Sequence, residues 1–216
     1  MTVSIQAFEK LPEQKRNRII KACITEFANH GYREASTNNI VRKLGIPKGS
    51  IFYWFKNKDG LYLHLVDLSV KVFVEEFAVA AREWPNEILA RLRIMIASSF
   101  TFLEQHPDHY RLFMSFMDGE ARHLLSPYLN KHWQEGLSVW TGWFTGVDSS
   151  DFRFTPEEVQ KLLMWVVAGI KVEMYAIVDR RDPVKSSRAF FMEHLDMMIR
   201  ILAHAIYRHP ERWGYD

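Results

Sequence analysis

Apolar residues recur at helical spacing along most of the chain, and proline, glycine and cap residues separate these stretches. In the first stretch Ile20, Ile24 and Phe27 follow one another at spacings of four and three residues, the period of an amphipathic helix. The flanking residues predict its ends near Pro12 and at His30-Gly31, because proline suits a first helical turn and glycine suits the residue after the last one. Sustained alternation with a period of two residues is missing from the sequence, so no strand is predicted.

Two short helices and a longer one are predicted next. Ser36 is the expected N-cap of a helix from Thr37 to Leu44, and Gly45 breaks the pattern. A second short helix is expected from about Pro47 to Phe55, and a longer helix, capped by Asn57, extends to about Arg82. The side chains predicted to face inward in the two short helices are Ile40, Val41, Leu44, Ile51, Phe52 and Phe55.

Longer helical stretches fill the rest of the chain. Helices are expected at about residues 86–105, 107–117, 121–145, 156–180 and 184–208. Thr155-Pro156-Glu157-Glu158 forms a capping box with proline at the first helical position, and Asp182-Pro183 opens the last helix in the same way. The predicted fold is therefore all-α, with about nine helices.

Composition narrows the class of protein. Of the 216 residues, 48% are apolar and 25% are charged, which is typical of a globular domain and excludes disorder and collagen-like repeats. The single cysteine, Cys23, excludes an internal disulfide framework and fits a reducing compartment. No stretch approaches the roughly 20 apolar residues of a membrane span, and the N-terminus has no signal-peptide pattern. We therefore expect a cytoplasmic protein.

The charge is unevenly distributed. Residues 1–60 carry 11 Lys and Arg against 5 Asp and Glu, whereas residues 61–216 carry 17 against 21. A basic first quarter is either a solvated face or a surface that meets a polyanion.

Residues 37–55 give this basic region a specific chemistry. Two short helices joined by a tight turn at Gly45 follow the helix-turn-helix plan, in which the second helix enters the major groove of DNA. Side chains outside the apolar stripes donate hydrogen bonds, and Lys48 and Lys58 can neutralise phosphates. Gly49 allows close backbone approach to DNA. The donors outside the stripes are Thr37, Asn38, Lys48, Ser50, Tyr53 and Trp54. Plain helical corners share this shape, but the donor-rich outer face favours DNA binding.

The segment GYREASTNNIVRKLGIPKGSIFYWFKNKDGLY, from Gly31 to Tyr62, resembles the DNA-binding domain of the TetR family of bacterial transcriptional regulators. The resemblance extends from about residue 12 to 68. It implies a DNA-binding domain at residues 1–57 and a ligand-binding and dimerisation domain at residues 58–216. It also implies a homodimeric repressor, not an enzyme, that binds a palindromic operator and leaves it when a small molecule binds. No cofactor and no membrane partner are expected.

Carried over position by position, the family's DNA contacts fall on Thr37, Asn38, Lys48, Gly49, Ser50, Tyr53, Trp54 and Lys58. Two positions depart from the family pattern. Trp54 stands where tyrosine or histidine is usual, and its indole donates a hydrogen bond but accepts none. Gly60 stands where a glutamate commonly completes the cap begun by Asn57, which predicts a weaker start of the following helix.

The last two predicted helices are apolar on two sides, so each needs two partners. One side suits the chain's own core, and the other suits a second chain in a four-helix dimer interface; a fully buried core helix is the alternative. Gly169 in mid-helix fits a close helix crossing. The interface candidates are Trp165, Gly169, Val172, Phe190, Phe191, His194, Met198 and Ile201.

Aromatic and methionine side chains are dense after residue 85, and they predict a hydrophobic or aromatic effector, although most of them must form the core. The effector candidates are Phe100, Tyr110, Phe113, Met117, Trp133, Trp140, Trp165, Met174 and Tyr175.

Two alternatives remain. The first is a helical-bundle metal enzyme of the di-iron type, because Glu120 and His123 match its Glu-x-x-His element; no second such element is present, so no metal site is predicted. An architectural DNA-binding protein without an effector is the other alternative.

Overall fold

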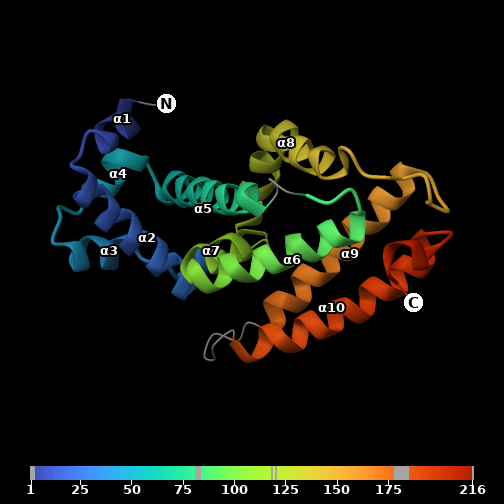
Figure 1. The fold of residues 1–216 in the computed structure, drawn as a ribbon. Helices are drawn as coiled ribbons and strands as arrows, with labels where there is room; N and C mark the ends of the chain where they lie inside the picture. The colour runs from blue at the N-terminus through green and yellow to red at the C-terminus, as the bar shows by residue number, and fades with distance from the viewer. Residues whose placement is uncertain (1–2, 81–83, 118, 120, 178–184, 216) are drawn as a thin grey trace. The chain divides into compact units, whose positions relative to one another are not determined.

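A computed structural model describes residues 3–80, 84–117, 119, 121–177 and 185–215. This described part holds ten α-helices, a short 3-10 helix and no strand, which confirms the all-α prediction (Figure 1). The chain forms two compact units. Unit 1 comprises residues 1–75 and 105–133, and unit 2 comprises residues 76–104 and 134–216.

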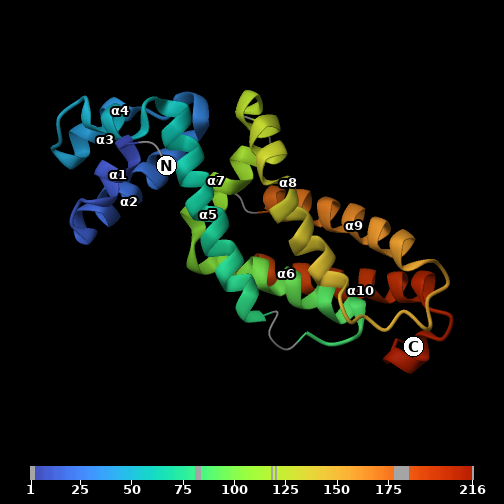
Figure 2. The ribbon, with the colours of Figure 1, turned by 90° about the horizontal axis from the view of Figure 1, so that it is seen from above.

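Unit 1 contains the region predicted to bind DNA. Its helices are α1 (Val3–Glu9), α2 (Glu13–Glu34), α3 (Thr37–Leu44), α4 (Ser50–Phe55), most of α5 (Lys58–Ala80), α7 (Pro107–Met117) and the first half of α8 (Arg122–Phe144). The first four helices gather at the N-terminal end of α5 (Figure 2). Helix α7 contacts α2, so a segment from after residue 100 belongs to the same unit as the predicted DNA-binding helices.

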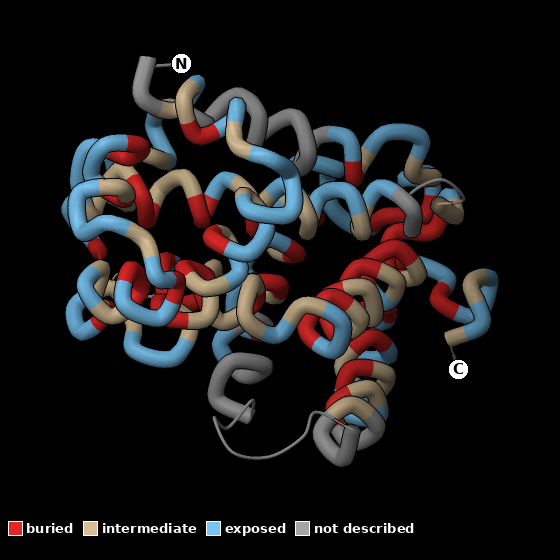
Figure 3. Tube along the Cα trace, turned by 90° about the vertical axis from the view of Figure 1, so that its left-hand side faces the viewer, coloured by how far each residue is buried: buried red, intermediate tan, exposed pale blue. Residues whose placement is uncertain are grey.

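One hydrophobic core holds unit 1 together. Cys23 and Phe27 of α2, Ile40 of α3, Ile51 of α4 and Leu65 of α5 are all buried in it. Along the helices the buried positions recur at helical spacing rather than continuously (Figure 3). Burial raises the pKa of the Cys23 thiol to about 12, with a smaller contribution from Glu26, so Cys23 serves as a small apolar core residue.

Unit 2 is built on α6 (Ile88–Gln105, of which Gln105 belongs to unit 1), α9 (Pro156–Ile177) and α10 (Lys185–Ile206), followed by a 3-10 helix at Pro210–Trp213. Arg93 pairs with Asp196 at 2.7 Å, and the Phe100 and Phe191 rings lie 5.0 Å apart. The residue numbers of these pairs increase along α6 and decrease along α10, so the two helices run antiparallel.

The structure corrects three expectations about the helices. Helix α1 was not predicted, and α4 begins at Ser50 rather than near Pro47. In α4 Phe52 was expected inward and Trp54 outward, but Phe52 is 46% exposed and Trp54 only 8%. Residues 51, 54 and 55 share one side of a helix with a 3.6-residue period, and residue 52 falls off it. The predicted break at Gly31 is confirmed as a kink in α2, with φ of 65°.

The contact-based units do not follow the predicted domain boundary at residues 57 and 58, because unit 1 also takes in most of α5, α7 and part of α8. That boundary concerns function, and it stays a prediction.

Candidate nucleic-acid interface

Local sequence fixes the geometry of the α3–turn–α4 segment. The Ser36 hydroxyl caps α3 by accepting a hydrogen bond from the Asn39 amide at 3.3 Å. Gly45 ends α3 in the left-handed region, with φ of 67°, where a side chain would be strained. The chain then turns through residues 46–49 into α4, which is the helix-turn-helix plan expected from the sequence.

The two helices bury their apolar side chains, with the exception of Phe52. Their buried positions are Ile40, Val41, Leu44, Ile51, Trp54 and Phe55. Among the predicted DNA contacts Asn38, Lys48, Gly49 and Tyr53 are exposed, whereas Thr37, Ser50 and Lys58 are half-buried. Seven of the eight predicted contacts therefore keep at least part of their surface open to solvent.

Trp54 is the exception. Its ring packs 5.4 Å from the Phe8 ring of α1, so the departure from the family pattern serves the core instead of displaying an indole donor. We therefore remove Trp54 from the proposed contacts. Phe52 takes its place on the outer face of α4; the sequence pattern placed it inward because its side chain has no polar group. An apolar ring there suits contact with a thymine methyl group in the major groove.

The buried Glu26 carboxylate links α2 to the residues at and before the start of α3 and to α3 itself. Glu26 of α2 accepts hydrogen bonds from the Ser36 amide at 3.2 Å, the Asn39 side-chain amide at 3.4 Å and the Lys43 ammonium at 3.0 Å. Burial alone would raise the pKa of Glu26, but these bonds and the Lys43 charge outweigh it and lower that pKa. The ionised carboxylate thus ties α3 to α2.

The first turn of α5 is fixed by the Asn57 cap and by contacts of Lys58 with α2. Asn57 caps the helix, accepting from the Gly60 amide at 2.8 Å. A Cβ at Gly60 would lie 2.2 Å from the Phe55 carbonyl oxygen, so a glutamate does not fit this backbone. The Lys58 ammonium donates to the Arg33 carbonyl at 3.0 Å and lies 5.0 Å from the centre of the Tyr32 ring. Phosphate contact by Lys58 stays a prediction.

Asp59 connects α2, α5 and α8. It accepts a hydrogen bond from the Tyr32 hydroxyl, and its Oδ2 lies 3.6 Å from Nε2 of His123. Burial and the Asp59 interaction raise the pKa of Tyr32 to about 12. Glu120, the other half of the Glu-x-x-His element, lies outside the described residues. Within the described part of the chain, no three His, Cys, Asp or Glu side chains gather as a metal site would require.

The candidate dimer residues fall into three groups. Trp165 and Val172 of α9 and Ile201 of α10 are 66%, 68% and 63% exposed, and Gly169 and His194 are also exposed. Met198 is half-buried. Phe191 is buried against Phe100 in its own unit, which corrects its placement on an outer face, and the Phe190 side chain lies outside the described ones.

The candidate effector residues are not brought together by the described part of the structure. Phe100 and Tyr110 are buried, Phe113 is half-buried and stacks on Phe73 at 6.3 Å, and Met117 and Trp165 are exposed. The remaining candidates, whose side chains lie outside the described ones, are Trp133, Trp140, Met174 and Tyr175.

Comparison with known proteins gives a consistent picture. Residues 19–65 match the family described as "Bacterial regulatory proteins, tetR family". An uncharacterized HTH-type transcriptional regulator, YdgC of Bacillus subtilis, is 23% identical over 114 residues, which are 51% of this chain and 58% of that protein. The fatty acid metabolism regulator protein of B. subtilis is 26% identical over 94 residues, covering 44% and 48%. The chain thus spans about half the length of these relatives.

The fold is shared more widely than the sequence. A TetR family transcriptional regulator from Chloroflexus aurantiacus superimposes with a TM-score of 0.61 at 18% identity, over 94% of this chain and 98% of that one. None of the described helices combines the length and the apolar character that crossing a bilayer requires. The resemblance seen in the sequence is confirmed: residues 19–65 match the tetR family, and the described fold is that of solved TetR family regulators.

Proposed function

We propose that the protein is a DNA-binding transcriptional repressor that acts as a homodimer on a palindromic operator and is released by a small hydrophobic or aromatic molecule. One observation carries the proposal. Helices α3 and α4 bury their apolar sides in the core of unit 1, while hydroxyl, amide and ammonium groups remain on the other side. The match of residues 19–65 to the tetR family supports it.

Within α3 and α4 the contacts divide by chemistry. Thr37 lies in the first turn of α3, where its hydroxyl, the free backbone N–H groups and the helix dipole all favour a phosphate. Lys48 precedes α4 and adds a cation. Ser50 and Tyr53 of α4 are the proposed base-reading residues, with Phe52 beside them.

Gly49 adds an independent argument. Its backbone is in the ordinary right-handed region, with φ of −75°, and a Cβ placed there meets no atom within 4 Å. Neither conformation nor packing within the chain therefore requires glycine. Close approach of a DNA backbone to α4 gives a reason for it.

The homodimer is proposed to form through α9 and α10. These helices expose Trp165, Val172 and Ile201 although their other sides already contribute buried residues to unit 2. Gly169 lies between Trp165 and Val172 at helical spacing, and a Cβ there meets no atom of the chain within 4 Å. A second copy offers the same apolar surface, which is what a two-fold interface needs.

The effector is proposed to bind among the aromatic and methionine side chains after residue 85. The half-sites of an operator lie about 34–36 Å apart, so the two DNA-binding segments of a dimer must match this spacing. To release the DNA, the effector must bind more tightly to a conformation in which the spacing is wrong than to the DNA-binding conformation. A tenfold loss of operator affinity requires about 1.4 kcal/mol of coupling.

Selection of bound sequences from a random duplex pool, followed by footprinting, tests the DNA-binding proposal. A palindromic consensus protected by the dimer is the expected result. Recovery of unrelated sequences would favour the architectural protein instead, and activation in a reporter assay would overturn the repressor role.

A further inference from the structure

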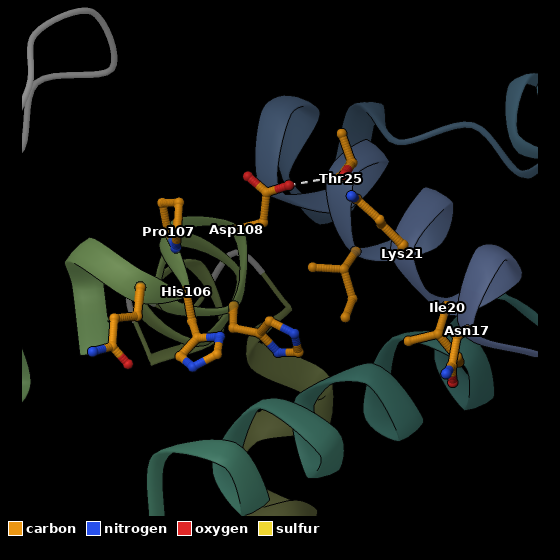
Figure 4. A pocket seen from close by; sticks show the side chains of 10 residues that line it. Asn17, Ile20, Lys21, Thr25, His106, Pro107 and Asp108 are labelled. Atoms are coloured by element: carbon orange, nitrogen blue, oxygen red, sulfur yellow. Dashed lines mark hydrogen bonds between the residues drawn. The ribbon is translucent and has the colours of Figure 1, made fainter. Parts of the chain in front are cut away.

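Unit 1 contains a hollow of about 590 Å3 between α2 and the turn that joins α6 to α7 (Figure 4). Ile20, Lys21, Ile24 and Thr25 line it from α2, and residues 105–109 line it from the opposite side. None of these residues is among the proposed DNA contacts, dimer residues or effector candidates. The volume lies in the range of small-molecule sites, about 300–1,000 Å3.

The α2 side of the hollow has an apolar floor and one cation. Ile24 is buried and Ile20 half-buried, and they lie one helical turn apart on the same side of α2. Lys21 stands next to Ile20 and is exposed. Among the described residues no hydrogen-bond or ion-pair partner of its ammonium is present, so its charge is available to an occupant.

The opposite side supplies polar groups with little uncompensated negative charge. Both oxygens of Asp108 are engaged, one by the Thr25 hydroxyl at 2.8 Å and the other by Arg111 at 2.6 Å. His109 is fixed by its contact with Ser69, whose hydroxyl lies 3.0 Å from Nδ1. Its other ring nitrogen and the His106 imidazole add polar groups to this side, and the amide side chain of Gln105 adds another.

We propose that this hollow binds a small organic anion, whose apolar body covers Ile20 and Ile24 and whose carboxylate pairs with Lys21. An anion is favoured over a cation because the lining leaves a positive charge unpaired, whereas Arg111 offsets the charge of Asp108. The site lies within the unit that carries the DNA-binding helices. Its lining shares no residue with the effector candidates named from the sequence.

Calorimetric titration of the full chain with 2-naphthoate, and with the uncharged 2-naphthamide, tests the proposal. Lys21 is exposed, so Lys21→Gln removes the charge without opening the core. The variant is expected to weaken 2-naphthoate binding at least tenfold and to leave 2-naphthamide binding unchanged. Lys21→Arg keeps the charge and is expected to retain the affinity of the wild type.

Lys15→Gln is the matched control, because it removes an exposed cation from another side of the same helix. It is expected to bind 2-naphthoate as the wild type does. Equal binding by wild type and Lys21→Gln would overturn the proposal, as would the absence of saturable binding to the wild type at millimolar concentration. Neither result depends on DNA, so the proposed regulatory function is tested separately.

Discussion

The two compact units present surfaces of opposite character. In unit 1, α3 and α4 expose hydroxyl, amide and ammonium groups, and Phe52 is the one large apolar side chain of these two helices that is not buried in the core. In unit 2, α9 and α10 expose large apolar side chains even though their other sides are buried. A polar, basic surface suits a polyanion, and an apolar one suits another protein surface. The difference indicates two partners of different chemistry, one for each unit.

Each of these two surfaces also has a glycine that the chain itself does not require. Gly49 and Gly169 have ordinary backbone conformations and open space where a Cβ would stand. Gly60 is the contrast, because a Cβ there would collide with a backbone carbonyl. At Gly49 and Gly169, which lie on the exposed surfaces described above, we expect an outside molecule to come close.

Each unit contains a buried carboxylate that accepts several hydrogen bonds, but the two carboxylates connect different kinds of groups. Glu26 in unit 1 joins α2 to α3. Glu87 in unit 2 caps the first turn of α6, accepting from the Leu89 amide at 2.8 Å, and it also accepts hydrogen bonds from the hydroxyls of Tyr207 and Tyr215. Burial and the Glu87 interactions raise the pKa of both Tyr215 and Tyr207.

Glu87→Ala is expected to have the largest effect on stability. The substitution removes a helix cap and leaves the buried Tyr207 hydroxyl without its acceptor, and each buried polar group left unpaired costs about 1–3 kcal/mol. The expected loss is about 3 kcal/mol, measured by urea denaturation. Tyr215→Phe, which leaves the cap intact, should cost less. A Glu87→Ala loss below about 1 kcal/mol would show that the cluster does not hold unit 2 together.

Tyr53→Ala is expected to weaken operator binding by about 1–3 kcal/mol without changing the melting temperature, because the side chain is exposed and reaches bases in the proposed complex. Ser50→Ala should act in the same direction. Lys48→Ala should weaken binding to all sequences and flatten the salt dependence by about one phosphate contact. Phe154→Ala, at an exposed aromatic of unit 2, is the control and should leave DNA affinity unchanged.

Gly169→Leu tests the apolar surface of unit 2. If a partner helix crosses at this glycine, the larger side chain costs about 1–3 kcal/mol of association free energy. Sedimentation should then show monomers at concentrations where the wild type is a dimer. Gly142→Leu, on α8 and also with open space around its Cβ, is the matched control. A wild-type monomer at micromolar concentration would refute the proposed dimer. A Gly169→Leu variant that dimerises as the wild type does would show that the interface does not include Gly169.

The sequence alone predicts most of the helices, because caps, prolines and apolar periods are local signals. The turn at Gly45 and the capping box at Thr155 are both present as expected, with Glu158 accepting from the Thr155 amide at 2.9 Å. The apolar pattern gave a wrong prediction for two nearby aromatic residues of α4, Phe52 and Trp54. Phe52 was predicted to face the core and Trp54 to donate a hydrogen bond at the surface. The Trp54 ring instead packs on Phe8 of α1, a helix that the sequence pattern did not predict.

The hollow beside α2 also escaped prediction. Its two sides are more than 80 residues apart, and the contact that brings them together, between Thr25 and Asp108, has no local signal in the sequence. The individual groups were visible, but their juxtaposition depends on α7 packing on α2.

Gly49→Ala is expected to leave folding stability unchanged and to lower operator affinity. The added methyl group meets nothing in the chain but lies on the outer side of the turn before α4. Comparing thermal melts with operator titrations separates the two effects. Unchanged operator affinity would show that DNA does not approach the backbone closely at Gly49.

The smallest expected effect is the pH dependence carried by Glu26. Its pKa is lowered in the folded state, so the unfolded chain binds more protons as the pH falls. The stability from Glu26 is therefore present above the unfolded pKa of a glutamate and is lost as the pH falls through the folded pKa. Glu26→Gln should flatten the acid side of the stability curve in denaturation series from pH 7 to pH 3. An unchanged slope would show that Glu26 does not hold α3 to α2 electrostatically.

The central claim, that α3 and α4 read DNA sequence, is tested most directly by the ratio of affinities for the selected operator and a random duplex at moderate salt. We expect the wild type to prefer its operator by at least about a thousandfold, as specific regulators do. Tyr53→Ala and Ser50→Ala should reduce this ratio, while Lys48→Ala should leave it nearly unchanged. Equal affinity of the wild type for operator and random DNA would contradict it.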